Sequence, residues 1–262
     1  MAKSQDIVWS RPLPDGAKPS SVTITQDKAG RYFVSILVEE TITPLAPTEK
    51  TVGIDLGLKS FLITSDGETI ANPKYYARDE KKLAKAQRRL AKKKKGSKNR
   101  AKARLKVAKW HARIADTRRD FQHQVSTRLV RENQTICLET LNVKGMLKNH
   151  CLAKSISDVG WSEFVRQLEY KASWYARTLI KIDRWYPSSK MCSACQHVLE
   201  ELTLDVREWA CPNCGVCHDR DINAAQNIKA VGLTVLACGG TVRRERVKAP
   251  RAGTVEAGNP RS

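Results

Sequence analysis

Two pairs of cysteines, each with two residues between its members, most constrain what this chain can fold into. Cys192 and Cys195 form the first pair, and Cys211 and Cys214 follow after fifteen intervening residues. Each pair fits one tight turn, and four thiolates held by two such turns can complete a tetrahedral shell around Zn²⁺. Because this paired spacing is seldom accidental, we expect the four cysteines to hold a structural zinc ion in a ribbon over 191–216.

The residues next to the second pair leave an alternative for the ligand set. Cys217 and His218 come directly after the ribbon and could in principle replace one cysteine. The four paired cysteines are the simpler choice, because each pair sits in a preformed turn. Of the other thiols, Cys137 lies in an apolar run, which favours packing in the core.

The charge of the chain points to a polyanionic partner. It has 47 Lys and Arg against 27 Asp and Glu, which gives a formal net charge of +20. Such an excess attracts nucleic acid. The N-terminus has no apolar signal region and no apolar run is long enough to cross a bilayer, so we expect a cytoplasmic protein without a membrane partner. In a reducing compartment, its eight cysteines favour metal ligands and free thiols over disulfides.

The first part of the chain reads as β-structure. Alternating β-branched and aromatic residues over 21–25 and 32–38, around a turn at 28–30, predict a hairpin. Prolines then indicate a linker, so we assign 1–48 to this hairpin and its linker. A strand follows at 51–57 with Asp55 as its one acid, and a second strand at 60–64 turns at 66–67.

A change in composition indicates a helical insertion over 78–131. Apolar residues recur at helical spacing, and a break at Gly96 and Ser97 predicts two helices that form a hairpin. A charge run can be a solvated face or a disordered segment, but helical periodicity in mid-chain favours an ordered surface that faces phosphates. Trp110 could stack on a nucleotide, although packing between the helices is the favoured interpretation. The candidate nucleic-acid-binding residues are Lys82, Lys85, Arg88, Arg89, Lys92, Lys93, Arg100 and Arg104.

The remaining elements carry two further acidic positions. A strand at 134–142 contains Glu139, a helix covers 161–176, and a strand over 179–186 leads into the ribbon. We expect the last helix, which has acids at its start, to run to about Ala230 and stop at Gly232, before a flexible tail over 234–262. Acids within apolar strands are unfavourable unless they bind something. Converging carboxylates would suit two Mg²⁺ or Mn²⁺ ions, but spacing alone does not show convergence, and an isolated acid is more often a salt-bridged surface group.

Several segments in one order resemble the TnpB (OrfB) family of transposon-encoded RNA-guided nucleases, the relatives of type V CRISPR effectors. They are Val52–Gly57, Leu138–Asn142, Arg184–Lys190, the two cysteine pairs, His218–Ala225 and Ala237–Thr241. The resemblance implies an α/β fold: an RNase H-like (RuvC) domain built from 49–77, 132–190 and 217–233. In that fold the basic helical hairpin and the zinc ribbon are insertions. The N-terminal β-hairpin is the part that remains of a larger β-barrel, the wedge.

The resemblance also implies the chemistry. Asp55, Glu139 and Asp221 correspond to the family's catalytic acids and would hold Mg²⁺ or Mn²⁺ for hydrolysis of DNA. Asp219 is the rival for the third acid, but its position before Asp221 suits a helix cap better. Guide RNA and target DNA are the implied partners. The expected activity is that of an insertion-sequence-encoded DNA endonuclease associated with transposition, which works at the prokaryotic nucleoid.

The chain departs from the family before the segment that starts near Lys18. Members carry a sizeable N-terminal region there, and this chain has only residues 1–17, so the resemblance implies an N-terminally truncated copy. The absent region is the part that holds guide RNA and reads the motif flanking the target. The alternative function is therefore a catalytically impaired protein that binds guide RNA or DNA. A strand-transfer transposase ranks last, although an acidic triad of this kind can serve that reaction too.

Overall fold

The computed structural model describes residues 7–10, 12–203 and 205–238. These residues divide between two compact units. One unit contains residues up to Ile42 together with Tyr75–Phe121, and the other contains Thr43–Lys74 and the residues from Gln122 onward. The expected tail beyond Cys238 lies outside the described residues. Among those that are described, no helix has the length and apolar character needed to cross a membrane.

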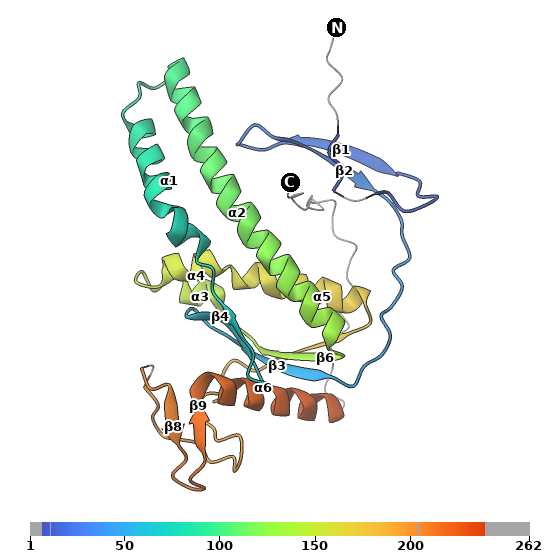
Figure 1. Cartoon of the computed structure of the whole chain (residues 1–262), viewed down its shortest axis with the longest axis vertical. Helices are drawn as coiled ribbons and strands as arrows, with labels where there is room; N and C mark the ends of the chain where they lie inside the picture. The colour runs from blue at the N-terminus through green and yellow to red at the C-terminus, as the bar shows by residue number, and fades with distance from the viewer. Residues whose placement is uncertain (1–6, 11, 204, 239–262) are drawn as a thin grey trace. The chain divides into compact units, whose positions relative to one another are not determined.

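The first unit contains a β-hairpin and a helical hairpin (Figure 1). Strands β1 (Ser21–Gln26) and β2 (Tyr32–Leu37) pair antiparallel, as the alternation predicts. Helix α1 (Tyr75–Ala91) and the long helix α2 (Lys98–Glu132) are joined through Gly96, whose φ of +80° favours glycine. The residues of α2 from Gln122 onward belong to the second unit. An ion pair between Arg31 and Asp116 joins the β-turn to α2.

A five-stranded mixed sheet forms the centre of the second unit, in the order β5-β4-β3-β6-β7. Strands β3 (Thr51–Leu56), β6 (Thr135–Glu139) and β7 (Thr178–Ile182) are parallel neighbours. Strands β4 (Ser60–Thr64) and β5 (Thr69–Ala71) continue the sheet antiparallel. The near-continuous apolar residues of β3, β4 and β6 are typical of strands covered on both faces.

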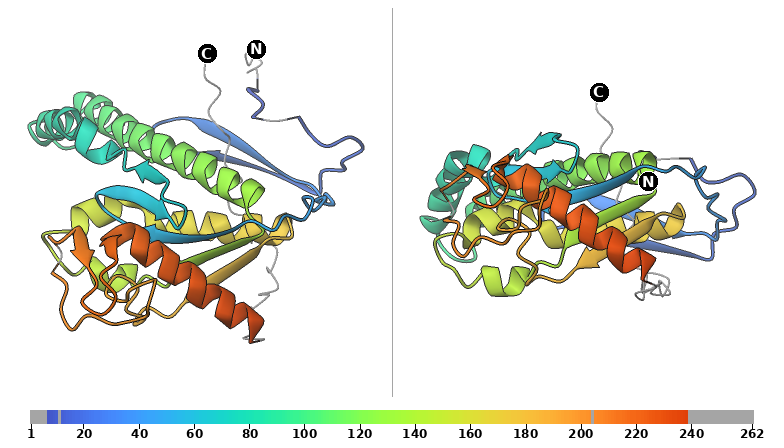
Figure 2. Two further views of the ribbon diagram at one scale, coloured as in Figure 1. Left: turned by 60° about the horizontal axis from the view of Figure 1, so that its bottom comes forward. Right: turned by 90° about the horizontal axis from the view of Figure 1, so that it is seen from below.

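Helices cover the two faces of this sheet (Figure 2). Helix α6 (Arg220–Ala237) lies across one face and contacts β3, β4, β6 and β7. Helix α5 (Trp161–Trp174) packs on the opposite face, where the Phe61 and Phe164 rings meet edge to face at 4.8 Å. Two short helices, α3 (Val143–Met146) and α4 (Ala153–Val159), connect β6 to α5.

The zinc-ribbon segment contains two short strands. Strand β8 (Glu208–Ala210) pairs antiparallel with β9 (Cys217–Asp219). Strand β9 ends at Asp219 and α6 begins at Arg220, so no linker separates the ribbon from the helix.

Several expected boundaries are wrong, among them the end of the strand expected over 134–142 and the start of the tail expected over 234–262. Two others have a clear physical reason. Strand β7 ends at Ile182 rather than near Tyr186, because Asp183 starts a turn: its carboxylate accepts the Trp185 N–H at 2.7 Å and its carbonyl accepts the Tyr186 N–H. Helix α6 continues through Gly232 to Ala237. This glycine lies where the helix touches the sheet, since a Cβ there would come within 2.3 Å of the Cys137 Sγ.

Candidate active site and metal centre

Asp55 and Glu139 lie on neighbouring strands at the same edge of the sheet. Strands β3 and β6 are parallel, and Ile54 pairs with Leu138, so each acid is the next residue along its strand. Side chains alternate between faces along a strand. Asp55 therefore shares a face with Gly53, and Glu139 shares it with Cys137. Gly53 closely approaches α6, so both carboxylates lie on the face that α6 covers.

Gly53 allows α6 to approach the sheet closely. A Cβ at this position would lie 2.1 Å from the Ala225 carbonyl oxygen, so only glycine fits beneath the helix. Asp221 lies one helical turn before Ala225, about 6 Å along the axis. Asp55 lies two residues beyond Gly53, about 7 Å along the strand. These two distances are similar, so the contact between Gly53 and Ala225 brings the start of α6, and with it Asp221, close to Asp55.

Asp55 is affected electrostatically by the other two acids. The pKa of Asp55 is raised from 3.8 to about 8, first by burial and then by the negative charges of Glu139 and Asp221, while Arg220 and Arg207 oppose the rise. Burial also raises the pKa of Glu139. Like charges held close together in a partly buried site disfavour ionisation. The arrangement therefore concentrates negative charge at one edge of the sheet.

The acids are close without forming a closed ligand shell. Within the part of the chain that the structure describes, only the four paired cysteines form a group whose candidate ligand atoms all lie within 4.8 Å of one another. Asp221 instead pairs with Arg207, whose Nη1 lies 3.3 Å from the carboxylate. Arg207 stands between the two cysteine pairs and was missed by the sequence analysis, because an arginine in a ribbon has no distinguishing pattern.

Asp219 and Asp221 have different positions at the start of α6. The Asp219 carboxylate accepts hydrogen bonds from the Asp221 N–H at 3.0 Å and the Ile222 N–H at 2.8 Å. It is thus the N-cap of the helix, as expected. Asp221 is left in the first turn, where it contributes to the raised pKa of Asp55.

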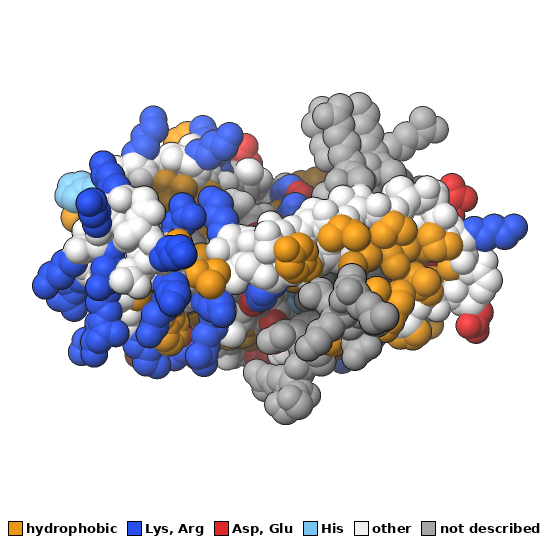
Figure 3. All heavy atoms as spheres, turned by 90° about the horizontal axis from the view of Figure 1, so that it is seen from above, with side chains coloured by type: hydrophobic (Ala, Val, Ile, Leu, Met, Phe, Trp, Pro, Cys, Tyr) orange, Lys and Arg blue, Asp and Glu red, His pale blue; other side chains and the backbone are white. Residues whose placement is uncertain are grey.

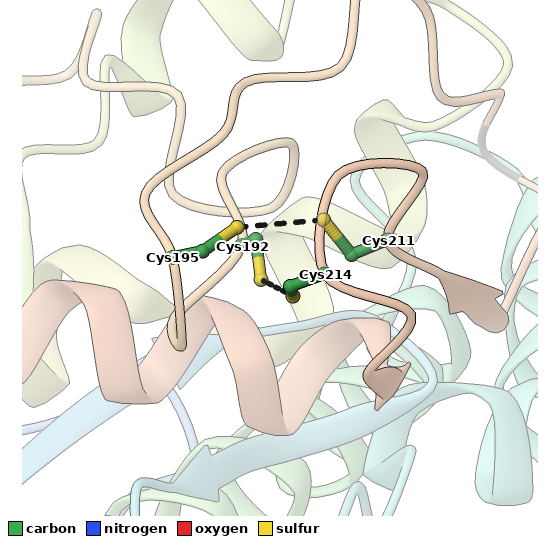
Figure 4. A group of neighbouring side chains, drawn as sticks. All are labelled: Cys192, Cys195, Cys211 and Cys214. Atoms are coloured by element: carbon green, nitrogen blue, oxygen red, sulfur yellow. Dashed lines mark hydrogen bonds between the residues drawn. The ribbon is translucent and has the colours of Figure 1, made fainter.

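The four paired cysteines form one cluster (Figure 4). The Cys192 and Cys214 sulfurs lie 3.7 Å apart, and those of Cys195 and Cys211 lie 3.6 Å apart. A tetrahedral site with Zn–S bonds of about 2.3 Å has sulfur–sulfur edges of about 3.8 Å. These two sulfur pairs thus have the spacing of a zinc shell, and all four sulfurs lie within 4.8 Å of one another. Cys217 is exposed and outside this cluster, so the structure favours the four-cysteine set, which suggests a structural zinc site.

His218 lies directly behind the cysteine cluster. Its Nε2 lies 3.0 Å from the Cys192 Sγ, and its ring packs on Trp209 with centroids 4.8 Å apart. Burial lowers the pKa of His218, which favours the neutral ring. A neutral imidazole with its proton on Nε2 donates to the thiolate. This is the position of an outer-shell partner that orients a metal ligand.

The basic side chains of the helical hairpin divide into two groups. Arg100 donates to the carbonyls of Leu90 and Lys93 and so caps the end of α1, and Lys82 pairs with Asp79. The other candidates are exposed, and Figure 3 shows Lys and Arg side chains crowded over this hairpin. They are Lys85, Arg88, Arg89, Lys92, Lys93 and Arg104.

Trp110 packs between the helices of this hairpin. It is half-buried, and the cationic ends of Lys82 and Arg113 lie 5.5 and 5.6 Å from the centre of its ring. Its position supports the packing interpretation over stacking on a nucleotide.

Comparisons with known proteins agree with the order of the motifs. The OrfB_IS605 family, described as "Probable transposase", matches residues 34–150, and the Cas12f1-like TNB domain matches residues 161–228. A Streptomyces pristinaespiralis protein named "Putative RNA-guided DNA endonuclease" is 56% identical over 94% of this chain and 61% of its own length. The Escherichia coli K12 protein "Putative RNA-guided DNA endonuclease InsQ" is 34% identical over 86% of this chain and 60% of its own.

A solved structure supports the fold independently. The chain in "Cryo-EM structure of the Cas12f1-sgRNA-target DNA complex" aligns with a TM-score of 0.51 at 17% identity, over 79% of this chain and 55% of that one. The present chain spans about three fifths of the length of the curated relatives named above. Two family matches in chain order and 56% identity to a relative over nearly the whole chain show that it belongs to the TnpB (OrfB) family.

Proposed function

We propose that the chain is the catalytic part of an RNA-guided DNA endonuclease with an RNase H-like (RuvC) fold. The observation that carries this proposal is the meeting of Asp55, Glu139 and Asp221 at one edge of the sheet, where each raises the local negative charge. The names of the relatives and the family matches support DNA as substrate and a guide RNA as partner. The insertion-sequence context follows from the same family.

Asp55, Glu139 and Asp221 would hold Mg²⁺ or Mn²⁺. The donor chemistry fits, because carboxylate oxygens are the ligands these ions prefer. The pKa of Asp55 is raised first by burial and then by the negative charges of Glu139 and Asp221, which a bound cation would offset. When bound, the ions would activate water and stabilise the leaving oxygen of the phosphodiester.

The rest of the chain would position the nucleic acid and the acids. Gly53 lets α6 bring Asp221 to the strands, and the zinc ribbon fixes the start of that helix. The exposed basic side chains of the α1–α2 hairpin would contact phosphates independently of sequence, while a guide RNA would read the target by base pairing. The hairpin and the ribbon would thus be insertions in one catalytic domain.

Cleavage assays with matched substitutions test the proposal. Purified full-length chain, with the RNA that co-purifies with it, is incubated with DNA that carries the complementary sequence and with Mg²⁺ or Mn²⁺. We expect Asp55→Asn, Glu139→Gln and Asp221→Asn each to lower the cleavage rate by more than about 100-fold, the upper end of the losses seen when a residue that only supports a metal ligand is removed. Asp219→Asn is the control, because asparagine caps helices as well as aspartate does.

Two outcomes would overturn the proposal. Cleavage that survives Asp55→Asn would show that the acids do not hold the catalytic ions. Equal losses in Asp219→Asn and Asp221→Asn would show that the effect comes from the helix end. A wild-type chain that binds its RNA and DNA without cleaving would instead establish the alternative function, a nucleic-acid-binding protein.

A further inference from the structure

Trp185 is unusually exposed for a tryptophan. Its relative exposure is 78%, the largest of any large hydrophobic residue in the described part of the chain. The guanidinium of Arg184 lies over its ring, 4.5 Å from the centroid. One face of the indole is therefore paired with a cation. Single exposed apolar residues are ordinary, but a cation stacked on an exposed aromatic ring is the arrangement with which proteins bind nucleobases.

The loop that carries Trp185 is fixed on both sides of it. The Asp183 carboxylate accepts the Trp185 N–H at 2.7 Å. The next residue, Tyr186, turns inward: it packs on a buried apolar cluster and its hydroxyl donates to the Met191 sulfur at 2.9 Å. The Ser188 carbonyl accepts a hydrogen bond from Asn227 of α6. The outward position of Trp185 is thus set by well-anchored neighbours.

This loop starts at the same sheet edge as the acids. Ile182, the last residue of β7, pairs with Glu139, and its carbonyl accepts hydrogen bonds from both the N–H and the hydroxyl of Thr140. Three residues span at most about 11 Å, so the Trp185 backbone lies within that distance of the strand end. The backbone of Trp185 would therefore lie close to a DNA strand whose phosphate reached Glu139.

We propose that Trp185 and Arg184 form a stacking site for a base of single-stranded DNA beside the acid cluster. The inference rests on the proposed function for the identity of the strand. The base would stack on the indole and the Arg184 guanidinium would contact the neighbouring phosphate. The site would hold one nucleotide next to the phosphodiester presented to Asp55, Glu139 and Asp221, without reading its identity.

Binding measured without Mg²⁺ or Mn²⁺ tests the stacking site separately from cleavage. The probe is a short, fluorescently labelled single-stranded DNA of mixed sequence, titrated with full-length protein. We expect Trp185→Ala to raise Kd roughly 5- to 150-fold, the range for loss of one stacked base, and Trp185→Phe to retain most of the affinity. Trp174→Ala is the matched control, because Trp174 is also exposed but packs on Tyr170 at the end of α5.

A second set of probes asks whether the contact is to a base. A single abasic site is placed at each position of the probe in turn. At one position it should weaken binding by the wild type and leave binding by Trp185→Ala unchanged, because that variant has already lost the stacking contact. Unchanged binding by Trp185→Ala, or equal losses in the two alanine variants, would overturn the stacking site, as would a Trp185 dependence seen only with RNA of the same sequence. Cleavage of DNA by the same samples with Mn²⁺ reports on the proposed function independently of these results.

Discussion

At the scale of single residues, the ionisation of Asp55 links the acid cluster to stability. Its pKa of about 8 in the folded chain compares with an ordinary value of 3.8. Between about pH 4 and pH 8, the folded chain therefore keeps on Asp55 a proton that the unfolded chain has already released. The stabilisation from this protonated group is fully present below that window and is lost as the pH rises through it.

We expect this linkage to disappear in Asp55→Asn. Without added Mg²⁺ or Mn²⁺, the free energy of unfolding of the wild type should fall relative to that of the variant as the pH rises from about 5 to 8. Urea unfolding at several pH values measures the difference. Added Mg²⁺ should restore the free energy of unfolding of the wild type near pH 8, because the ion binds the ionised carboxylates. Parallel pH curves for the two proteins would contradict the raised pKa.

His218 provides a second prediction for a single side chain. Because its Nε2 lies 3.0 Å from the Cys192 sulfur, His218→Ala should remove a hydrogen bond to the thiolate and weaken zinc binding by about 10- to 100-fold. Competition with a chromophoric chelator measures the affinity. The control is His197→Ala, since His197 lies in the same ribbon with an exposed side chain. Equal zinc affinity in the two variants would show that the contact has no role in binding.

At the scale of elements, the contact between α6 and β3 should depend on the absence of a side chain at Gly53. In Gly53→Ala the new Cβ would meet the Ala225 carbonyl, which belongs to the helix backbone, so the helix must move. We expect a loss of about 1–3 kcal/mol in the free energy of unfolding and a fall in the pKa of Asp55 as Asp221 withdraws. Urea unfolding and NMR titration of Asp55 measure the two effects.

The control substitution for that experiment lies on the same helix. In Gly232→Ala the new Cβ would meet Cys137, about three helical turns along α6 from Asp221. It should reduce stability and leave the pKa of Asp55 near 8. If both alanine variants lower that pKa equally, the proximity of the acids does not depend on the Gly53 contact.

Elements with local signals could be predicted from the sequence, and those set by tertiary contacts could not. Residues close together in the sequence determine the geometry of the hairpin around Gly30 and of each cysteine pair. The structure confirms the hairpin and the clustering of the four thiols. Gly232 looked like a helix end, but it lies inside α6 because the sheet approaches it there. The proximity of Asp55 and Glu139 depends on the parallel pairing of two strands far apart in the sequence, which no local spacing contains. Their catalytic role stays a prediction.

At the scale of the whole molecule, the net charge of +20 should make nucleic-acid binding strongly dependent on salt. Each phosphate contact that is lost changes the slope of log K against log[salt] by about 0.9 for duplex DNA. We expect the double substitution Lys92→Gln and Lys93→Gln to make that slope shallower by about 1 to 2. Fluorescence anisotropy with a short duplex over a range of salt concentrations measures it.

A matched pair distinguishes a local contact from a general effect of charge. Lys144→Gln with Lys148→Gln removes the same charge from exposed positions in and after the short helix α3. This variant should keep the wild-type slope. An equal change in both double variants would mean that total charge, and not the α1–α2 hairpin, determines the affinity.

The direct joint between β9 and α6 has a consequence for engineering this family. Asp219 ends a ribbon strand and caps the helix, and Asn223 accepts the Ser193 N–H while donating to the Met191 carbonyl. Because no linker separates the two elements, the position of the ribbon fixes the start of the helix that carries Asp221. A ribbon taken from another protein would have to reproduce the β9–α6 junction residue for residue. A single glycine inserted between Asp219 and Arg220 should uncouple the position of the ribbon from that of α6.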